Sequence, residues 1–589
     1  MRTTFETVAG VWLAALLVGC GGAPRYPEPS PSFFEPVTLS VEIDGTEGEV
    51  GGARVERPFF ESTGVAPQLG RLFGDAEYTA DASNAAIVSA RFWRDNLEAD
   101  PTWIGRALTI DGTGHTVVGV MPPGFESPAG TALWIAGPPP AVVFQGVRLF
   151  DGETVVPVAT VVIENRVVTQ VSGPGEQIRT PLRAHVVDGT GKTLLPGMVD
   201  AHAHSINRER LKGAVAFGVT THLDMFTALP VMQQMKAEQE AGAAADRADL
   251  FSAGTLVTAP GGHGTQYGFE IPVLSSSEEA GAFVDARVAE GADYIKLIHD
   301  DGRSAGMSIP TLDKATLRAA VEAAHARNRL AVVHIGDREH ARSAVEVDAD
   351  GLVHVFADQP TDDAFIQLAA RRGVFVVPTL AIIDSVGGGT GGAALIDDPH
   401  LNPLLMPAAV ANLNPTMPAR EGLAFSLDIA LEAVRRLHRA GVPVLAGTDA
   451  PNPGTYHGVS MHEELELLVR AGLTPVEALA AATSATADAF GLDDRGRIAP
   501  GARADVWLVD GDPTTDILAT RAIEGIWKEG RRWKLELLRE QVQRLRAEQA
   551  AAGGKRLAVD ELHHRAPRGV RPPDSGVTAD PPLRATVRR

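Results

Sequence analysis

This sequence has only one cysteine, Cys20, in 589 residues. A single thiol cannot form a disulfide within the chain, so a disulfide framework is excluded. Apolar runs are short as well, and none reaches the roughly 18 residues that a membrane-spanning helix needs. Positive charge is scarce, because 53 Lys and Arg stand against 74 Asp and Glu, for a net charge of −21. That balance argues against a nucleic-acid partner, and no internal repeat indicates a solenoid or a propeller.

The rest of the composition is ordinary. With 44% hydrophobic and 22% charged residues, the chain is typical of a soluble globular protein. Its length suggests material for three or four domains.

What the chain does have is an ordered series of metal-binding residue types. The series consists of His202 and His204 in LLPGMVDAHAH, Lys296 in ADYIKLI, His334 in LAVVHIG, His354 in GLVHVF and Asp449 in PVLAGTDAP. Each lies at or just past the end of a short apolar run, and such runs alternate with helical stretches, as the parallel strands of an α/β barrel do. Active sites of that architecture lie at the C-terminal ends of the strands. Residues i and i+2 of a strand face the same way, so His202 and His204 can bind one ion together.

Each element alone has a simpler explanation. The chain has 17 histidines, so an HxH pair can arise by chance. A single histidine after an apolar strand, such as His334, is more often a hydrogen-bonded structural residue. The residue types, their order and their place at strand ends together favour metal binding.

These segments resemble the amidohydrolase superfamily of metal-dependent hydrolases. The resemblance is carried by PGMVDAHAH, IKLI, VVH, VHVF and AGTDAP, with HEELELLVRAGLTPVEALAAATSATADAFGL and GRIAPGARADVWLVDGDP. It covers about residues 142–532 and is strongest to the binuclear branch of imidazolonepropionase-like and Xaa-Pro dipeptidase-like enzymes. It implies an α/β fold, a (β/α)8 TIM-like barrel over 197–496. A small β-sandwich is expected from 142–196 and 497–532, where alternating apolar and polar residues with Asp-Gly turns predict antiparallel strands.

The resemblance also implies two metal ions. In this branch a lysine after the fourth barrel strand reacts with carbon dioxide, and the carbamate bridges the ions; Lys296 stands at that position. A lysine ammonium has no lone pair for a metal, and the apolar segment YIKLI favours the neutral amine that carboxylation needs. The alternative is a lysine whose stem packs while its head reaches water. The resemblance assigns His202, His204 and Asp449 to one ion, His334 and His354 to the other, and Lys296 to both.

The expected chemistry follows from the charges. Two divalent ions that share a water lower its pKa, so a bridging hydroxide forms near neutral pH. Asp449 would take the hydroxide proton and pass it to the leaving nitrogen. Zinc is the expected ion, although manganese or cobalt fits the same ligands. The expected activity is cleavage of the amide (C–N) bond of small substrates such as Xaa-Pro dipeptides or N-acyl amino acids. Two alternatives stay open: cyclic amides, lactones or esters as substrates on the same fold, and a non-catalytic binding protein.

Polar residues near other strand ends are candidates for contact with a substrate. They are His222, His263, Tyr267, His299 and His457. His263 lies in the glycine-rich segment APGGHGTQYG and is the catalytic candidate for polarising the carbonyl or holding a substrate carboxylate. HDDG after Lys296 replaces the small-residue loop typical of the family. Histidine and tyrosine also brace loops, so a structural role is the alternative for each.

Residues 1–20 are typical of an export signal. The apolar run VAGVWLAALLVG is too short to span a membrane and ends in LVGC, which resembles a bacterial lipobox with Cys20 as the lipidated residue. The Pro- and Ser-rich residues 21–37 suit a linker. We expect an exported, periplasmic or membrane-anchored lipoprotein. The alternative is a mis-assigned start or an uncleaved N-terminus in a cytoplasmic protein.

Residues 38–137 do not belong to the hydrolase. They are similar to the periplasmic core domain of MacB-like ABC-transporter permeases, above all in GRALTIDGTGHTVVGVMPPGF. The pattern predicts an α+β domain, with short strands in ALTID and HTVVGVM around a helix near 87–97. The absence of long apolar runs excludes a working permease, so we expect a module without catalytic function.

The C-terminus predicts a helix over 533–552, packed on the sandwich, and a disordered Pro- and Arg-rich tail over 553–589. The expected partners are a small-molecule substrate, no nucleic acid, and a membrane through lipidated Cys20; an oligomer is compatible with the sequence.

Overall fold

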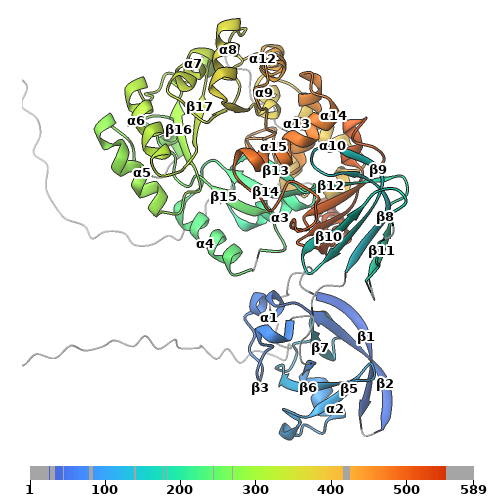
Figure 1. The fold of residues 1–589 in the computed structure, drawn as a ribbon. Helices are drawn as coiled ribbons and strands as arrows, with labels where there is room; N and C mark the ends of the chain where they lie inside the picture. The colour runs from blue at the N-terminus through green and yellow to red at the C-terminus, as the bar shows by residue number, and fades with distance from the viewer. Residues whose placement is uncertain are drawn as a thin grey trace, which may run out of the picture.

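The computed structural model describes residues 26, 34–43, 45–78, 84–137, 141–176, 178–181, 184–242, 244–267, 270–414 and 425–551. The expected signal segment with Cys20 and the expected C-terminal tail lie outside these residues. The described chain forms a small N-terminal lobe and a larger lobe (Figure 1). Among the described residues, no helix has both the length and the apolar character needed to cross a membrane.

The small lobe is a closed β-barrel. Its strands are β1 (Phe34–Ile43), β2 (Thr46–Val55), β3 (Leu69–Gly70), β4 (Ala85–Val88), β5 (Ala107–Ile110), β6 (Thr113–Val120) and β7 (Leu133–Ala136). They pair in the order β6, β4, β7, β2, β1 and β5, and β5 pairs back to β6, while β3 lies along β6. The predicted helix is present as α2 (Ala90–Asn96). The closure of the strands into a ring is a difference from the predicted α+β pattern, because it depends on long-range pairing that local patterns do not encode.

Part of the predicted linker belongs to this lobe. β1 begins at Phe34, inside residues 21–37, and the hydroxyl of Tyr26 donates to the carbonyl of Pro123 at 3.1 Å. Aromatic side chains form much of the core: the rings of Phe59 and Phe60 in α1 (Pro58–Thr63) meet edge to face, with centroids 4.8 Å apart. Tyr26 and residues 34–37 of the predicted linker are therefore in contact with this lobe or part of it.

Segments from both sides of the barrel sequence join in one eight-stranded sheet. Its strands are β8 (Val142–Phe150), β9 (Val155–Glu164), β10 (Val167–Ser172), β11 (His185–Asp188), β12 (Lys192–Pro196), β20 (Val506–Asp510), β21 (Ile523–Lys528) and β22 (Arg531–Trp533). β12 pairs antiparallel with β20, so the two segments meet there as the alternating patterns predict. β11 and β12 run parallel to β8, however, and hairpin patterns do not predict these two pairings.

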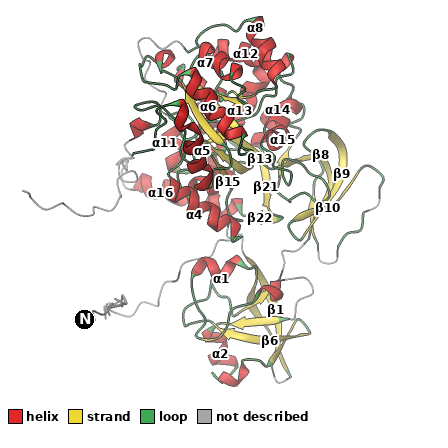
Figure 2. Cartoon of the chain, turned by 60° about the vertical axis from the view of Figure 1, so that its left-hand side comes forward, coloured by secondary structure: helices red, strands yellow, loops and turns green. Residues whose placement is uncertain are grey.

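The centre of the large lobe is a TIM-barrel-like ring of parallel strands, with helices around it (Figures 1 and 2). The strands are β13 (Met198–Ala203), β14 (Val219–Asp224), β15 (Asp249–Ser252), β16 (Ile295–His299), β17 (Ala331–Ile335), β18 (Gly351–Val353) and β19 (Phe375–Val377). β13–β15 form one parallel sheet and β16–β19 another. The parallel bridges Val257–Leu297, Val376–Val444 and Ala203–Ala450 join them, the last two through the segment that carries Asp449. The C-terminal ends of these strands therefore share one mouth.

The helices of the large lobe are α3 (Arg208–Val215), α4 (Leu229–Glu240), α5 (Ala280–Ala289), α6 (Lys314–His325), α7 (Arg338–Glu346), α8 (Asp363–Arg372), α9 (Leu380–Val386), α10 (Gly391–Asp397), α11 (Pro407–Leu413), α12 (Leu427–Arg439), α13 (Val459–Arg470), α14 (Pro475–Ala481), α15 (Ser484–Ala489) and α16 (Leu535–Ala551). α6 shows why they form. The Asp313 side chain caps its N-terminus by accepting the Thr316 N–H at 2.8 Å. Leu317, Val321 and Ala324, at helical spacing, are fully buried.

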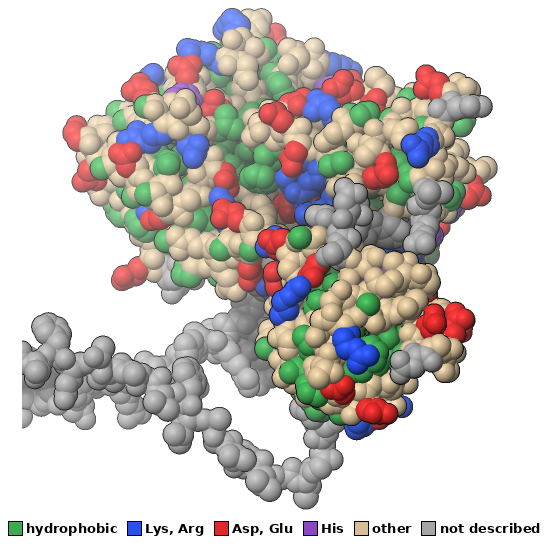
Figure 3. All heavy atoms as spheres, turned by 60° about the horizontal axis from the view of Figure 1, so that its bottom comes forward, with side chains coloured by type: hydrophobic (Ala, Val, Ile, Leu, Met, Phe, Trp, Pro, Cys, Tyr) green, Lys and Arg blue, Asp and Glu red, His purple; other side chains and the backbone are tan. Residues whose placement is uncertain are grey.

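The predicted C-terminal helix is present as α16. The Arg546 guanidinium donates to Asn402 Oδ1 at 2.8 Å and to the Leu405 carbonyl at 3.2 Å, so this part of the helix lies against the segment before α11, a contact that the sequence does not predict. At the junction of the lobes, Arg531 pairs with Glu56, and Ala245 of the large lobe joins the buried cluster of the small one. On the face shown in Figure 3, acidic and basic side chains are interspersed over both lobes.

Candidate metal centre

His202, His204 and Asp449 come together at the mouth of the ring. Asp449 Oδ1 lies 3.3 Å from Nε2 of His202 and 3.0 Å from Nε2 of His204. One potential ligand atom from each of the three residues lies within 4.8 Å of the others. Two imidazole nitrogens and a carboxylate oxygen at this spacing match the ligand types that zinc takes in proteins.

His334 and His354 form a second group beside the first. Nδ1 of His334 lies 3.0 Å from Nε2 of His354, and the rings of His354 and His202 have centroids 4.9 Å apart. Burial lowers the pKa of His202 to about 3 and that of His354 well below its ordinary value. The rings are therefore neutral near pH 7, which is the form that can ligate a metal.

Lys296 is buried next to both groups. It lies in β16 with 3% of its surface exposed. Burial lowers the pKa of its amine to about 7, although the charges of Asp449 and Asp224 oppose this shift. The charge of Lys296 in turn lowers the pKa of both His202 and His354, so the amine acts on members of both groups. A large share of this lysine is thus a neutral amine near neutral pH.

The backbone at the mouth is strained. His354, Asp449 and Thr379 adopt left-handed conformations, with φ of 61°, 55° and 52°. Such conformations cost residues with a side chain energy and persist where the surroundings impose them, often at functional sites. Gly447 allows the segment that carries Asp449 to approach β13. A Cβ at Gly447 would lie 2.6 Å from Val377 Cγ1 and 2.8 Å from the backbone nitrogen of His202.

Asp200 forms hydrogen bonds with the segment that carries Asp449 and with the strand that carries His202. Its Oδ1 accepts the N–H groups of His202 and Thr448 at 3.1 and 3.0 Å, and its Oδ2 accepts the Thr448 hydroxyl at 2.6 Å. Burial raises the pKa of this carboxyl to about 7. The contacts fix the backbone of His202 relative to that of Asp449, one residue after Thr448.

Two of the predicted substrate-contact residues lie beside the proposed ligands. The His263 ring stacks on that of His334, with centroids 4.7 Å apart and an interplanar angle of 23°. The hydroxyl of Tyr267 lies 3.4 Å from Nε2 of His263, and its ring centroid lies 6.0 Å from that of Phe226. Tyr267 is 53% exposed, so this segment is open to a ligand.

The other three predicted contacts are differently placed. His222 and His457 are fully buried, and their rings stack on each other. His222 contacts the Ser205 hydroxyl at 3.1 Å, and His457 contacts the His204 carbonyl at 2.9 Å. His299 is 6% exposed and bonds the Leu312 carbonyl at 2.9 Å. In this structure these side chains brace the loops around the mouth, and contact of any of them with a substrate stays a prediction.

Sequence reasoning missed two residues that contact the proposed ligands. Thr379 Oγ1 lies 2.7 Å from Nδ1 of His354, and Asp300 Oδ2 lies 3.3 Å from Nε2 of His334. Thr379 follows β19, so its place after an apolar run was an available signal. Asp300 lies in HDDG, where the departure from the family pattern was visible but its partner was not.

Two surface cavities lie elsewhere. Their volumes are about 370 and 300 Å³, and both are lined by Asp384 and Gly389. Neither is lined by any of the six proposed ligands, so the chemistry of the side chains, and not cavity size, locates the candidate site.

The amidohydrolase family model matches residues 193–532. This range holds every strand of the ring and all six proposed ligands. The chain belongs to the amidohydrolase family. Members of this family are hydrolases that act on carbon–nitrogen bonds, and metal dependence is typical of them.

This amidohydrolase is similar to several imidazolonepropionases. It is 27% identical to that of Deinococcus radiodurans over 372 residues, which cover 59% of this chain and 84% of the relative. It is 29% identical to that of Nocardia farcinica, over 63% of this chain and 91% of the relative. The imidazolonepropionase of Deinococcus deserti is 40% identical, but the match spans only 29% of that relative and 19% of this chain.

Solved structures share the fold. A Xaa-Pro dipeptidase with bound methionine matches 67% of this chain and 100% of its own, with a TM-score of 0.55 and 22% identity. Molinate hydrolase matches 68% of this chain and 96% of its own, with a TM-score of 0.54 and 21% identity. The MacB-like periplasmic core domain model matches residues 28–171. That match runs into β8–β10, which the structure places in the eight-stranded sheet of the large lobe.

Proposed function

We propose that this chain is a binuclear metal-dependent amidohydrolase that cleaves the amide bond of small substrates such as Xaa-Pro dipeptides or N-acyl amino acids. The observation that carries the proposal is the meeting of two ligand groups beside one buried lysine. In the first group Asp449 Oδ1 lies 3.0 Å from His204 Nε2, and in the second His334 Nδ1 lies 3.0 Å from His354 Nε2.

The residues present fit two divalent ions, for which we propose zinc. His202, His204 and Asp449 would hold one ion, and His334 and His354 the other. Lys296 would bridge them as a carbamate, which a buried amine with a pKa of about 7 is able to form. When bound, the ions supply Lewis acidity toward a carbonyl group and toward water.

The protein's own side chains transfer the protons and position the substrate. Asp449 directs Oδ1 at both histidines of the first group. Its carboxylate accepts a proton from the attacking water and delivers it to the leaving nitrogen. His263, held against His334, donates to the carbonyl oxygen or binds a substrate carboxylate. The ring of Tyr267, next to Phe226, offers an apolar wall to the substrate.

The comparisons support small substrates with a carbon–nitrogen bond but leave two classes. Solved neighbours include a Xaa-Pro dipeptidase and a putative prolidase from Bifidobacterium longum, which favour linear dipeptides. The curated relatives include several imidazolonepropionases, which keeps cyclic amides as the second class, with lactones or esters after them.

The test combines metal analysis of the purified protein with a hydrolysis screen of Xaa-Pro dipeptides, N-acyl amino acids, cyclic amides and lactones. We expect two ions per chain and turnover of one amide class. Asp449→Asn should remove turnover, and Asp494→Asn, at an exposed carboxylate with 55% side-chain exposure, should keep it. Fewer than two ions together with no turnover would contradict the proposal and favour a non-catalytic binding protein.

We further propose that the hydrolase is exported as a lipoprotein and that its N-terminal lobe is a module without catalytic function. The match of the MacB-like periplasmic domain supports an extracytoplasmic location. The parallel bridges at Val444 and Ala450 support a complete (β/α)8 barrel over 197–496, with the sandwich from 142–196 and 497–532. Labelled palmitate should enter the wild type and not a Cys20→Ala variant; equal labelling would contradict lipidation at Cys20.

A further inference from the structure

Asp300 lies against His334 on the ring nitrogen that faces away from His354. Oδ2 of Asp300 is 3.3 Å from Nε2 of His334, while Nδ1 of the same ring is 3.0 Å from Nε2 of His354. A neutral imidazole carries its proton on one nitrogen and offers a lone pair at the other. A carboxylate accepts but cannot donate, so it holds the proton on Nε2 and leaves Nδ1 free.

We propose that Asp300 is a positioning residue that fixes His334 as an Nδ1 ligand of the second metal ion. The inference rests on the proposed function, because it requires an ion between His334 and His354.

Three local features hold Asp300 in this place. Its Oδ1 accepts the N–H of Gly302 at 2.9 Å, and its own N–H donates to Thr311 Oγ1 at 2.8 Å. Gly336, two residues after His334, leaves the space that the carboxylate fills, because a Cβ at Gly336 would overlap Asp300 Oδ1. The contacts with the Gly302 N–H and the Thr311 hydroxyl therefore direct the carboxylate at His334, and a side chain at position 336 would displace it.

The His334 ring is held on a face as well as on an edge. His263 stacks on the face with centroids 4.7 Å apart, and Asp300 contacts the edge. His354 has a different partner, the Thr379 hydroxyl at 2.7 Å from Nδ1, and a hydroxyl can donate or accept. The tautomer of His334 is thus imposed by a charge, whereas that of His354 is not.

A second explanation for Asp300 is a separate cation site with Asp301 and His340, since ligand atoms of these three residues lie within 4.8 Å of one another. Other partners already engage two of them. His340 Nδ1 lies 2.9 Å from Asp337 Oδ1, and Asp301 Oδ2 lies 2.5 Å from Arg303 Nη2. The contacts therefore favour the role of Asp300 toward His334.

The experiment compares Asp300→Asn with Asp301→Asn, the same change at the next residue, in the purified full chain. Metal-free proteins are titrated with Zn²⁺ against a competing chelator, and the visible absorption of the Co²⁺-loaded proteins is recorded. We expect Asp300→Asn to bind the second ion roughly 10- to 100-fold more weakly and to change the cobalt spectrum. Asp301→Asn should match the wild type in both measurements.

Gly336→Ala displaces the carboxylate without removing its charge and should reproduce the loss, which keeps the test decisive if Asp300→Asn does not fold. Wild-type affinity and an unchanged cobalt spectrum in Asp300→Asn, or in a folded Gly336→Ala, would overturn the inference. An equal loss in Asp301→Asn would also overturn it, in favour of the separate cation site. A wild type that binds fewer than two ions would instead contradict the proposed function.

Discussion

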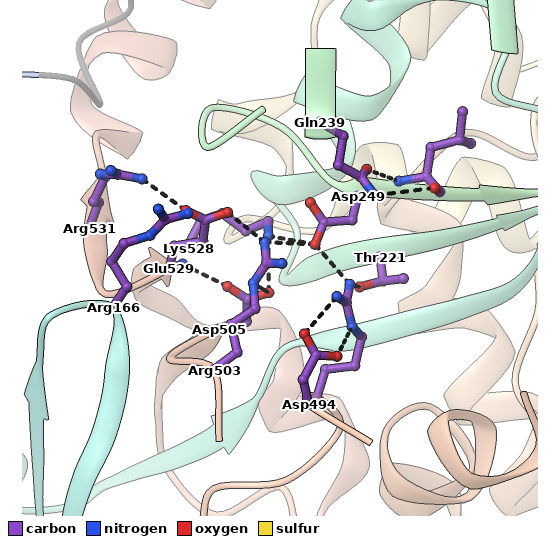
Figure 4. A network of polar contacts seen from close by, with 12 residues as sticks. Arg166, Thr221, Gln239, Asp249, Asp494, Arg503, Asp505, Lys528, Glu529 and Arg531 are labelled. Carbon is purple, nitrogen blue, oxygen red and sulfur yellow. Dashed lines mark hydrogen bonds and ion pairs between the residues drawn. The ribbon is translucent and has the colours of Figure 1, made fainter. Parts of the chain in front are cut away.

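Lys528 and Asp249 form an ion pair with 3.0 Å between Nζ and Oδ2, although their side chains are only 0% and 1% exposed. Asp249 Oδ2 also lies 2.8 Å from Arg495 and 2.7 Å from Arg503, and Lys528 Nζ lies 3.0 Å from Asp505 (Figure 4). Asp249 opens β15 and Lys528 ends β21. The network therefore joins the barrel to the flanking sheet at the end of β15 away from the mouth.

Replacement of Asp249 by Asn should destabilise the protein strongly. The change removes the buried carboxylate that Lys528, Arg495 and Arg503 share, and the remaining buried partners, such as Asp505, no longer balance the three positive charges. Removing one partner of a buried ion pair costs about 3–5 kcal/mol of unfolding free energy. Chemical denaturation measures the loss. Glu153→Gln is the control, because Glu153 pairs with Arg497 at 63% side-chain exposure and should change the unfolding free energy by less than about 1 kcal/mol. If both variants fell within 1 kcal/mol of the wild type, the network would not contribute to stability as described.

Glu464 should make the protein less stable as pH rises. It is fully buried in α13, its Oε2 accepts the Ala381 N–H at 2.8 Å, and burial raises the pKa of its carboxyl to about 8 from an ordinary 4.5. The folded state therefore holds this proton more tightly than the unfolded state. Its contribution to stability is fully present below pH 4.5 and is lost as pH rises toward 8.

Glu464→Gln removes this ionisation and tests the sign. Compared with the wild type, the variant should gain stability between pH 5 and pH 8, by a few kcal/mol for a shift of this size. Unfolding curves of both proteins at the two pH values give the difference. A constant difference across this range would mean that Glu464 does not titrate between the folded and unfolded pKa values.

The meeting of the proposed ligands at one mouth could be predicted from the sequence because each of them follows a local pattern. His202, Lys296 and His334 lie in parallel strands, and His354 and Asp449 lie just beyond apolar runs. Because the strands follow one another around the ring, the order of these residues along the chain predicts where each lies at its mouth. The predicted join of the two flanking segments also rested on strand patterns, and the β12–β20 pairing confirms it.

What could not be predicted depends on contacts between distant residues. Nothing near His222 in the sequence shows that its ring stacks on that of His457 with no exposed surface. The partnership of Asp300 with His334 joins residues 34 positions apart and also requires the gap at Gly336. The closed ring of the small lobe follows from the β5–β6 and β1–β5 pairings, which short strand patterns do not encode.

Metal uptake should depend on carbon dioxide through Lys296. In the proposed carbamate the neutral Nζ adds to the carbon of CO₂, an N–C bond forms, and one proton leaves. Metal-free protein should therefore bind less Zn²⁺ in a buffer depleted of carbon dioxide, and bicarbonate should restore binding. Lys296→Met should bind weakly under both conditions, whereas Lys192→Met, at a surface ion pair with Glu524, should respond like the wild type. Bicarbonate-independent uptake of two ions by the wild type would contradict the carbamate.

His263 and Tyr267 should differ in their effect on turnover. His263 stacks on His334, and in the proposed role its ring N–H donates to the substrate carbonyl. His263→Asn should then lower kcat by about 10²- to 10³-fold, the cost of losing that donor to a developing oxyanion. Tyr267→Phe keeps the ring near Phe226 and loses only a hydroxyl 3.4 Å from His263, so kcat should fall by less than about tenfold.

Steady-state kinetics distinguish two possible roles of His263, polarising the carbonyl and binding a substrate carboxylate. Both variants are measured on the substrate found in the screen. If it polarises the carbonyl, kcat falls while KM changes little, because the contact strengthens only as charge develops. If it binds a substrate carboxylate, KM rises while kcat is kept. For substrates without that carboxylate, His263→Asn then has the same kcat and KM as the wild type. Wild-type values of both constants in His263→Asn would remove His263 from the reaction and leave its stacking on His334 as a structural contact only.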